Sequence, residues 1–407
     1  MRKHLLSAAL LLPATMAMSA GYQLNLQGLR QLAMGAGGCA TPWDASAIFY
    51  NPGALSNISS FQVYGSAQFI MPKVQYAENQ PGGSTVRSEN QTFTPFNFYV
   101  GGPLKKGGRL GVGLGVYTPF GSGLKWDDNW TGRNIIQEIE LRSFFIQPTV
   151  SYRISDMVSV GGGFIYALGN VTLRRGIPVQ DTAGIEGNAK LKGNANGLGF
   201  NFGIHLRAND KLSFGLTYRS RVNMKVKDGD ATFSVPNSLK SRFPSTTFSA
   251  ELPLPEVLSL GVAYKPLDKL TLQLDFNLTG WKAYKELSFD YTDTVIADTK
   301  AARNYHNRLA TRLGAHYQAT NALALMIGGA YDPSPVIDNY VSPDLPDANR
   351  VVLTGGFTVK PTKHLTIMAA VEYVSSEKRN ANYAEANFSG RYQTKAITPG
   401  IGVTYDF

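Results

Sequence analysis

Ionisable side chains on segments with strand-like alternation are the residues of this chain whose types could catalyse a reaction. The period of two in such segments predicts that His205, His306 and His316 point to the same side of a sheet. The sequence contains no Gly-x-Ser-x-Gly motif, and no histidine is spaced from a cysteine or another histidine as metal ligands are. A single histidine on such a face is usually a solvated polar residue. We therefore expect no catalytic residue, no metal site, no cofactor and no enzyme activity.

Arginines on similar segments are candidates to bind a ligand that carries a carboxylate. A buried carboxylate needs a cation nearby, because an unpaired buried charge is very unfavourable. The alternative is that an arginine pairs with an acidic residue such as Asp275, and we expect this role for any single one. As a set, however, we expect at least one to contact the ligand, with Arg174 and Arg219 as first choices. The candidates are Arg174 and Arg175 beside a long loop, and Arg219, Arg221, Arg308 and Arg312, which alternation assigns to an inner face.

The elements that must position these side chains have the pattern of β-strands. Between Lys269 and Trp281, leucine or phenylalanine alternates with Thr, Gln, Asp or Asn, and residues 396–407 alternate in the same way. Segments 110–116 and 212–219 repeat the pattern. A period of two places one set of side chains on each face of a sheet. Because the second set is small, polar or charged, the pattern favours an all-β barrel over a packed sandwich.

The spacing of turns gives the architecture of this sheet. Short polar turns, such as 105–108 and 209–210, alternate along the chain with longer loops, such as 126–140 and 333–349. Outer-membrane barrels have short turns at one end and long loops at the other. Counting from Phe61 predicts a transmembrane antiparallel barrel of about 14 strands. No stretch after the N-terminal segment offers the roughly 20 apolar residues that a spanning helix needs.

The first 58 residues divide into two parts that precede the barrel. Residues 1–20 combine a basic start, an apolar run and Ser19-Ala20, which is typical of a cleaved signal peptide. Residues 21–58 are rich in small residues and contain the turn Asn51-Pro52-Gly53. Such a segment needs an enclosing wall to satisfy its backbone polar groups. We expect it to be a plug inside a barrel formed by residues 59–407.

Composition narrows the possible partners. Without Arg2 and Lys3, 37 basic residues face 29 acidic ones, a formal charge of +8. These charges are spread over many turns and loops, whereas a nucleic-acid-binding protein would gather them on one face. One cysteine cannot form an internal disulfide. We expect no nucleic-acid partner.

At this point the chain resembles the FadL-type outer-membrane transporters of long-chain fatty acids and other hydrophobic compounds. The resemblance covers nearly the whole mature chain and depends on the order of several short motifs. Gly53 stands where the family usually has alanine. The motifs are the GYQLN opening at Gly21, Asn51-Pro52, Thr217-Tyr218-Arg219-Ser220, Leu254-Pro255-Glu256, Trp281 followed by Leu287, Asp332-Pro333-Ser334-Pro335-Val336, and Leu345-Pro346-Asp347-Ala348-Asn349-Arg350.

The resemblance implies passive transport in the outer membrane of a Gram-negative bacterium. Extracellular loops capture a hydrophobic ligand, an apolar pocket in the barrel holds it, and a gap between strands releases it sideways into the membrane. It also implies that Trp281 and the cation at Arg174 or Arg175 line the pocket. We expect hydrophobic small molecules, membrane lipid and lipopolysaccharide as partners, and a monomer. Long-chain fatty acids are the expected ligands; aromatic hydrocarbons, or a general porin-like or structural barrel, are the alternatives.

Prolines and glycines in three consecutive strands are the expected site of the lateral gap. Proline cannot donate a hydrogen bond to a neighbouring strand, and glycine has no side chain to pack. The alternative for Pro95 and Pro119 is that they only mark where strands enter outer loops. The residues expected at this lateral gate are Pro95, Gly113, Pro119 and Pro148.

Overall fold

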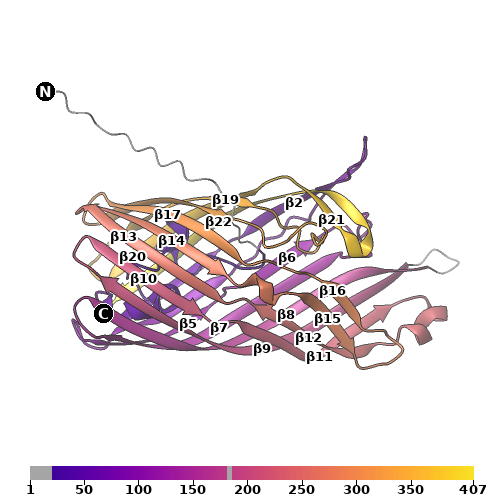
Figure 1. The fold of residues 1–407 in the computed structure, drawn as a ribbon, viewed down its shortest axis with the longest axis horizontal. Coiled ribbons are helices and arrows are strands. Elements are labelled where there is room, and N and C mark those ends of the chain that lie inside the picture. Colours follow the sequence, from indigo (N-terminus) through magenta and orange to yellow (C-terminus); the bar gives the residue numbers. More distant parts are fainter. Residues whose placement is uncertain (1–20, 181–185) are drawn as a thin grey trace.

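The computed structural model describes residues 21–180 and 186–407 as one closed antiparallel β-barrel (Figure 1). The wall closes because the first two strand segments, β1 (Gln62–Gln68) and β2 (Met71–Ala77), pair with the last one, β22 (Phe388–Asp406). When interrupted segments are counted as one strand, the barrel has 14 strands, and the predicted fold class is confirmed. The expected signal peptide, residues 1–20, lies outside the described residues.

Many of the 14 strands consist of two segments separated by a kink, so that the wall contains 22 segments. The remaining segments are β3 (Thr85–Arg87), β4 (Phe96–Pro103), β5 (Leu110–Tyr117), β6 (Gly121–Lys125), β7 (Glu138–Arg153), β8 (Val158–Gln180), β9 (Glu186–Arg207), β10 (Leu212–Arg219), β11 (Val222–Ser234), β12 (Thr246–Leu254), β13 (Val257–Leu267), β14 (Leu270–Thr279), β15 (Glu286–Tyr291), β16 (Thr299–Ala302), β17 (Arg308–Gln318), β18 (Leu323–Asp332), β19 (Arg350–Val359), β20 (Leu365–Ser376) and β21 (Arg379–Tyr383).

Along the strands, large apolar side chains on the outer face alternate with small or polar side chains on the inner face. In β14, Leu272 and Leu278 are exposed outside, whereas Thr271, Gln273 and Asp275 are buried inside. An exposed apolar outer face is what a wall in contact with lipid requires. The period-two segments of the sequence correspond to β5, β10, β14 and β22, so those strand predictions are confirmed.

The two ends of the barrel differ in the length of their connections. Short turns join β4 to β5, β7 to β8, β9 to β10, β13 to β14, β17 to β18 and β19 to β20. These turns lie at the end that carries the C-terminus in Figure 1, while β8, β9 and β11 extend beyond the opposite end. In an outer-membrane barrel the short turns face the periplasm and the long loops face outward.

Residues 21–61, indigo in Figure 1, lie inside the barrel. They contain α1 (Leu29–Ala33), α2 (Ala47–Tyr50) and the 3-10 helix η1 (Pro52–Asn57). α1 ends after five residues because Gly35 and Ala36 adopt positive φ angles, 77° and 61°. Further 3-10 helices are η2 (Asn237–Arg242) and η4 (Ala384–Ala386) in outer loops, and η3 (Trp281–Ala283) at the kink between β14 and β15. Among the described residues, no helix is long and apolar enough to cross a membrane.

Candidate functional site

Asn51 fixes the plug to the wall of the barrel. Its side chain is fully buried, and its amide nitrogen donates to the carbonyl oxygens of Cys39 (2.7 Å) and Ile204 (2.9 Å). Its Oδ1 accepts a hydrogen bond from the Gly53 backbone at 3.0 Å, which caps η1. One side chain therefore joins two parts of the plug to β9.

Glycine at position 53 allows this close contact. A Cβ on Gly53 would lie 2.5 Å from the carbonyl oxygen of Gly203 in β9. On the other side, a Cβ on Gly161 of β8 would lie 2.4 Å from the carbonyl oxygen of Pro52. The turn therefore packs backbone against backbone, which explains why this chain departs from the alanine that the resemblance leads one to expect.

Three of the candidate arginines hold backbone carbonyls inside the barrel. Arg219 donates from Nη2 to the Phe49 carbonyl at 2.7 Å, and its guanidinium lies 3.8 Å above the Phe49 ring. Arg312 donates from Nη1 to Gly35 (3.1 Å), and Arg308 donates from Nε to Ser334 (2.8 Å). Arg219 and Arg312 thus help to seat the plug, and Arg308 holds the 333–349 loop.

Arg221 lies on the exposed side of the wall. The chain breaks its alternation at Ser220 between β10 and β11, so that Val222 is buried and Asn223 is exposed. Arg221 is consequently exposed and pairs with Glu256, with Nε 3.4 Å from Oε2. Strict alternation assigns this residue to the inner face, and the break reverses that assignment.

The three histidines occupy unlike surroundings. His205 is buried beside the plug, with Nε2 at 3.1 Å from the Ala40 carbonyl oxygen. His316 is also buried, and its ring lies 4.5 Å from that of Trp43. His306 lies in the loop between β16 and β17 and is exposed, so strand alternation does not apply to it.

An almost entirely apolar cavity of about 840 Å³ lies above the plug between β7, β8, β11 and β12. Tyr22 forms one wall and donates from its hydroxyl to the Pro253 carbonyl oxygen at 2.6 Å. The other main lining residues are Ile139, Leu141, Val171, Leu173, Met224, Val226, Leu252, Leu254, Tyr284, Leu287 and Phe289.

Trp281 supports this apolar cavity from behind. The indole is fully buried in η3 and its ring lies 4.8 Å from that of Tyr22, edge to face. Tyr22 also lies 5.6 Å from Tyr284, which lines the cavity itself. Trp281 therefore fixes Tyr22, and Tyr22 contacts the space that a ligand would occupy.

An outer cavity of about 1,390 Å³ adjoins the apolar cavity and shares Leu173, Leu287 and Phe289 with it. Arg175 lines this outer cavity and, within the described residues, makes no ion pair. Arg303 also lines it, but is bound to Asp344 with Nη2 2.9 Å from Oδ2. Burial alone would lower the pKa of Arg303, yet Asp344 and the nearby tyrosines raise it well above its ordinary value. Arg303 is therefore a fixed charge.

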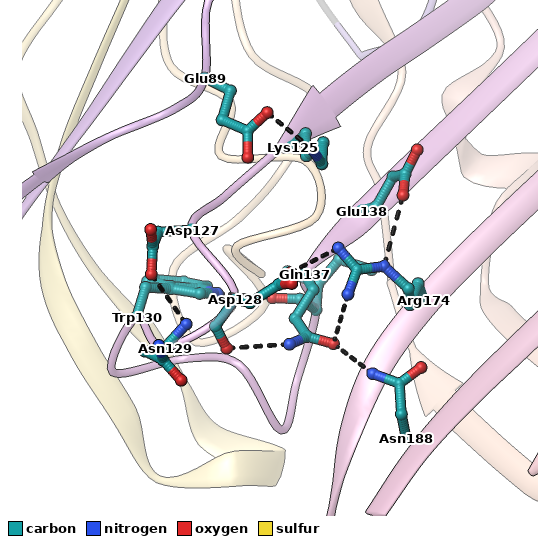
Figure 2. Close-up of polar contacts among 11 residues, drawn as sticks. Glu89, Lys125, Asp127, Asp128, Asn129, Trp130, Gln137, Glu138, Arg174 and Asn188 are labelled. Carbon is teal, nitrogen blue, oxygen red and sulfur yellow. Dashed lines mark hydrogen bonds and ion pairs between the residues drawn. The ribbon is translucent and has the colours of Figure 1, made fainter. Parts of the chain in front are cut away.

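Arg174 lines neither of these two cavities. It holds the loop 126–137, as Figure 2 shows. Its guanidinium contacts Asp128 (Nη2–Oδ1 2.6 Å), Glu138 (Nε–Oε2 3.4 Å) and Gln137. Asn188 donates to the Oε1 of Gln137 at 2.7 Å. Arg174 is thus already paired with acidic residues, whereas Arg175 makes no ion pair with any described residue.

The wall is interrupted beside the apolar cavity, at the kink between β5 and β6. β5 pairs with β4 and β7, but within the described residues β6 pairs with β7 alone. At the kink the start of the plug acts as the missing neighbour, because Leu24 donates to the Pro119 carbonyl (2.9 Å) and Gly121 donates to that of Tyr22 (3.0 Å). Tyr22 thus links the apolar cavity to the interruption.

A third cavity, of about 1,930 Å³, lies at this interruption and shares Ser122 and Leu141 with the apolar cavity. Residues 92–96 and 121–124 border it on either side. Phe93 packs against Gly123, where a Cβ would lie 2.0 Å from the phenyl ring. At the outer end, Glu89 donates from its backbone to the Lys125 carbonyl (2.8 Å), and the two side chains form an ion pair at 2.7 Å (Figure 2).

The four residues expected at a lateral gate lie in different positions relative to the interruption. Pro95 borders the third cavity, and Pro119 forms the kink itself. Gly113 is paired on both sides, with Gly101 of β4 and Thr149 of β7. Pro148 is paired with Leu114, and the pairs between β7 and β8 skip it.

The start of the plug is also held by an outer loop. The Gly21 backbone nitrogen donates to Oδ2 of Asp347 at 3.0 Å, and Ser334 donates to the same oxygen at 2.9 Å. Burial raises the pKa of Asp347 above its usual range, against the opposing effects of Arg350 and of these hydrogen bonds. This contact holds Gly21 at the third cavity, which Gly21 and Asp347 both line.

Residues that sequence reasoning did not select form most of this site. Tyr22, Phe93, Ser122, Met224 and Tyr284 are examples. They come from separate strands and loops. The family motifs include some lining residues of the apolar cavity, namely Tyr22, Leu254, Leu287 and Leu345, but nothing in those motifs shows that these residues meet.

Comparison with known proteins shows relatives over the full length of the chain. Residues 10–407 match the family described as outer membrane protein transport protein (OMPP1/FadL/TodX). A putative outer membrane protein of Neisseria meningitidis serogroup B is 27% identical, covering 96% of this chain and 95% of the relative. The long-chain fatty acid transport protein of Escherichia coli K12 is 26% identical over 100% and 98%.

Solved structures agree with this assignment at the level of the fold. A FadL homologue from Pseudomonas aeruginosa superposes with a TM-score of 0.82 at 19% identity, covering 95% of this chain and 100% of that one. The toluene transporter TodX of P. putida gives 0.74 at 15% identity, covering 93% and 98%. The chain therefore belongs to the OMPP1/FadL/TodX family of outer-membrane proteins that transport hydrophobic compounds.

Proposed function

We propose that this protein admits long-chain fatty acids across the outer membrane by passive diffusion. The outer loops capture the ligand, the apolar cavity holds its chain, and the third cavity releases it sideways between residues 92–96 and β6. The single observation that carries the proposal is that the apolar cavity shares lining residues both with the outer cavity at the loops and with the third cavity at the interruption in the wall. A monomer surrounded by lipid and lipopolysaccharide is sufficient for this route.

Entry of a fatty-acid chain into the apolar cavity is favourable, because burial of each CH₂ group lowers the free energy by about 0.8 kcal/mol. Release into the membrane keeps the chain out of water, whereas release through the periplasmic end would expose it again. The plug closes that end, since Asn51 and Gly53 join it to β9. The lateral route is therefore the favourable one.

Arg175 is the proposed partner of the carboxylate. It lies in the outer cavity next to the lining shared with the apolar cavity, and its charge is not matched by an ion pair within the described part of the chain. A chain inserted into the apolar cavity would leave its carboxylate at this boundary. Arg219, Arg308 and Arg312, by contrast, already bind backbone carbonyls.

The adjacent residues Arg174 and Arg175 provide a matched test. Arg175→Gln should weaken binding of a long-chain fatty acid by about 1.5–3 kcal/mol, the value of a hydrogen bond to a charged group. Binding of the alkane of equal chain length should stay unchanged. Arg174→Gln removes the same charge on the opposite face and should leave both affinities near those of the parent. Equal weakening of acid and alkane by Arg175→Gln, or none, would contradict the proposed role of Arg175.

Monoaromatic hydrocarbons are the second candidate ligands. The apolar lining of the 840 Å³ cavity favours them, because an uncharged ring needs no cation. In the binding assay above, an affinity for toluene above that for any fatty acid would favour this candidate over the first. Lipids identified by mass spectrometry in the purified barrel would show which class the cell supplies.

A further inference from the structure

The positive charge of the mature chain is concentrated at the periplasmic end of the barrel. The short turns and the strand ends next to them carry ten Lys or Arg residues against four Asp, which leaves 27 basic and 25 acidic residues in the rest of the mature chain. The rim therefore carries a formal charge of +6 out of the +8 of the mature chain. We call these ten cations the periplasmic ring: Lys105, Lys106, Arg109, Arg153, Arg207, Lys211, Lys265, Lys269, Lys360 and Lys363.

The cations of the periplasmic ring are not paired with acids. Within residues 21–180 and 186–407 there are 11 ion pairs, and none of them includes a member of the ring. Arg153 donates to the Gly108 carbonyl at 2.9 Å, which leaves its charge uncompensated. Of the four acids, Asp406 is occupied by Ser60 and Gln62, whose side chains donate to it at 2.6 and 2.7 Å.

The periplasmic ring lies at the level of the lipid head groups. Tyr152 and Tyr264 are exposed on the outer face and directly precede the ring members Arg153 and Lys265. Aromatic side chains on the outside of a barrel mark the interface between the apolar layer and the head groups. Other exposed aromatic residues at this end are Tyr317, Tyr405 and Phe407.

The cations are also spread around the circumference. Five of the six short turns, or the strand ends beside them, carry at least one of them. Arg153, Arg207, Lys211 and Lys265 border a hollow of about 860 Å³ beside the plug, and they remain unpaired in the described structure although Asp156 and Asp210 border it too. These four cations gather at the mouth of the barrel, whereas the other six are exposed on the turns around it, where an annulus of lipid can meet them.

We propose that the periplasmic ring binds the phosphate groups of anionic phospholipids, such as phosphatidylglycerol, in the inner leaflet of the outer membrane. Ten unpaired cations next to an aromatic band complement a layer of negative head groups. Binding would fix the depth of the barrel in the membrane. This interaction is independent of the transported ligand, because no member of the ring lines any of the three ligand cavities.

The test uses the folded, full-length mature protein in lipid nanodiscs with equal amounts of phosphatidylglycerol and phosphatidylethanolamine. Native mass spectrometry then counts the lipids that remain bound to the released barrel. We expect phosphatidylglycerol to be retained about fivefold over phosphatidylethanolamine, the factor that corresponds to one Lys or Arg near an anionic surface. Equal retention by the parent would overturn the proposal.

Two charge-matched variants test whether the preference for phosphatidylglycerol depends on the periplasmic ring. The ring variant combines Lys105→Gln, Lys106→Gln, Lys211→Gln, Lys265→Gln and Lys360→Gln, and should lose the preference. The control combines Lys190→Gln, Lys192→Gln, Lys227→Gln, Lys240→Gln and Lys300→Gln, which removes five exposed cations at the opposite end and should keep it. Equal loss in both variants would mean that net charge, and not the ring, attracts the lipid.

Two measurements on the parent protein alone complete the test. Raising the salt concentration should reduce the preference for phosphatidylglycerol, because salt screens exposed charges. A preference that does not change with salt concentration would contradict electrostatic binding of the lipid by the ring. Millimolar inorganic phosphate should leave the preference intact. If phosphate abolishes it, the cations form a site for a soluble anion and the lipid assignment is wrong.

Discussion

Two sectors of the barrel wall contact the plug in different ways. In the sealed sector, formed by β8–β10 and β14, the strands are continuously paired and the plug packs against them through Asn51, Gly53 and Cys39. In the open sector, formed by β3–β6, β6 lacks a strand neighbour on one side within the described residues, and Tyr22 to Leu24 of the plug stand in for it. The plug is thus fixed to the wall in the sealed sector and takes the place of a missing strand in the open sector.

The difference between the sectors follows from the residues at the contacts. The sealed sector uses buried side-chain hydrogen bonds and close contacts between glycines and the plug backbone. The open sector uses two backbone hydrogen bonds, at 2.9 and 3.0 Å, beside a large cavity. Breaking the open contacts requires less free energy, so movement of the plug should begin there.

The largest effect is expected from Asn51→Ala in the sealed sector. The substitution removes three hydrogen bonds of a buried side chain, each worth about 1 kcal/mol, so the attachment of the plug to the wall should weaken by about 3 kcal/mol. We expect reduced fatty-acid uptake by cells, with barrel assembly close to normal as judged by the shift in migration after boiling. Movement of the plug would then affect transport without affecting the wall.

Asn194→Ala is the matched control for this change, since Asn194 of β9 is exposed. It should behave like the parent. Loss of the folded band in proportion to uptake in Asn51→Ala would show that the turn serves folding rather than transport.

The barrel was predictable because its determinants are local. A period of two, short polar turns and an even spacing of loops are visible in any window of the sequence, and β14 and β22 follow from them directly. Alternation fails where the backbone leaves the ladder. The break at Ser220 places Arg221 outside, and His306 lies in a loop.

The site was less predictable because its parts meet only when the barrel closes. Phe93 contacts Gly123 across the interruption, and Tyr22 meets Tyr284 from the other end of the chain. Arg174 and Arg175 are neighbours in sequence, yet only the folded loop reveals that acids already surround Arg174. The sequence could suggest a cation beside the long loop, but it could not show which of the two arginines is free of an acidic partner.

An intermediate effect is expected from Ser122→Trp in the open sector. Ser122 lies on β6 and lines both the apolar cavity and the third cavity, so a large side chain there should obstruct passage between them. Overpacking of this kind costs about 1–3 kcal/mol, which as an added barrier corresponds to roughly tenfold slower uptake. Leu258→Trp, on the outer face of β13 in the wall, is the control and should leave uptake unchanged. Normal uptake by Ser122→Trp would exclude this passage as the exit route.

The smallest effect is expected from Lys125→Gln, which breaks the ion pair with Glu89 at the outer end of the interruption. Both side chains are partly exposed, so the pair should contribute no more than about 0.2–1 kcal/mol. The loss of this ion pair should nevertheless be detectable, because the backbone hydrogen bond from Glu89 to the Lys125 carbonyl ties the free side of β6 at the same place.

The matched control for that change is Lys225→Gln. Lys225 pairs with Glu251 at 3.6 Å across β11 and β12, where it is as exposed as Lys125 or more so, and where the neighbouring strands are paired. Amide hydrogen exchange should become faster in residues 121–125 of Lys125→Gln, because β6 has only β7 to hold it once the outer contact loosens. Exchange in β11 of Lys225→Gln should stay at the parent rate, because the ladder on either side persists. Equal acceleration in both variants would mean that the open sector is no weaker than the rest of the wall, and the contrast between the two sectors would fail.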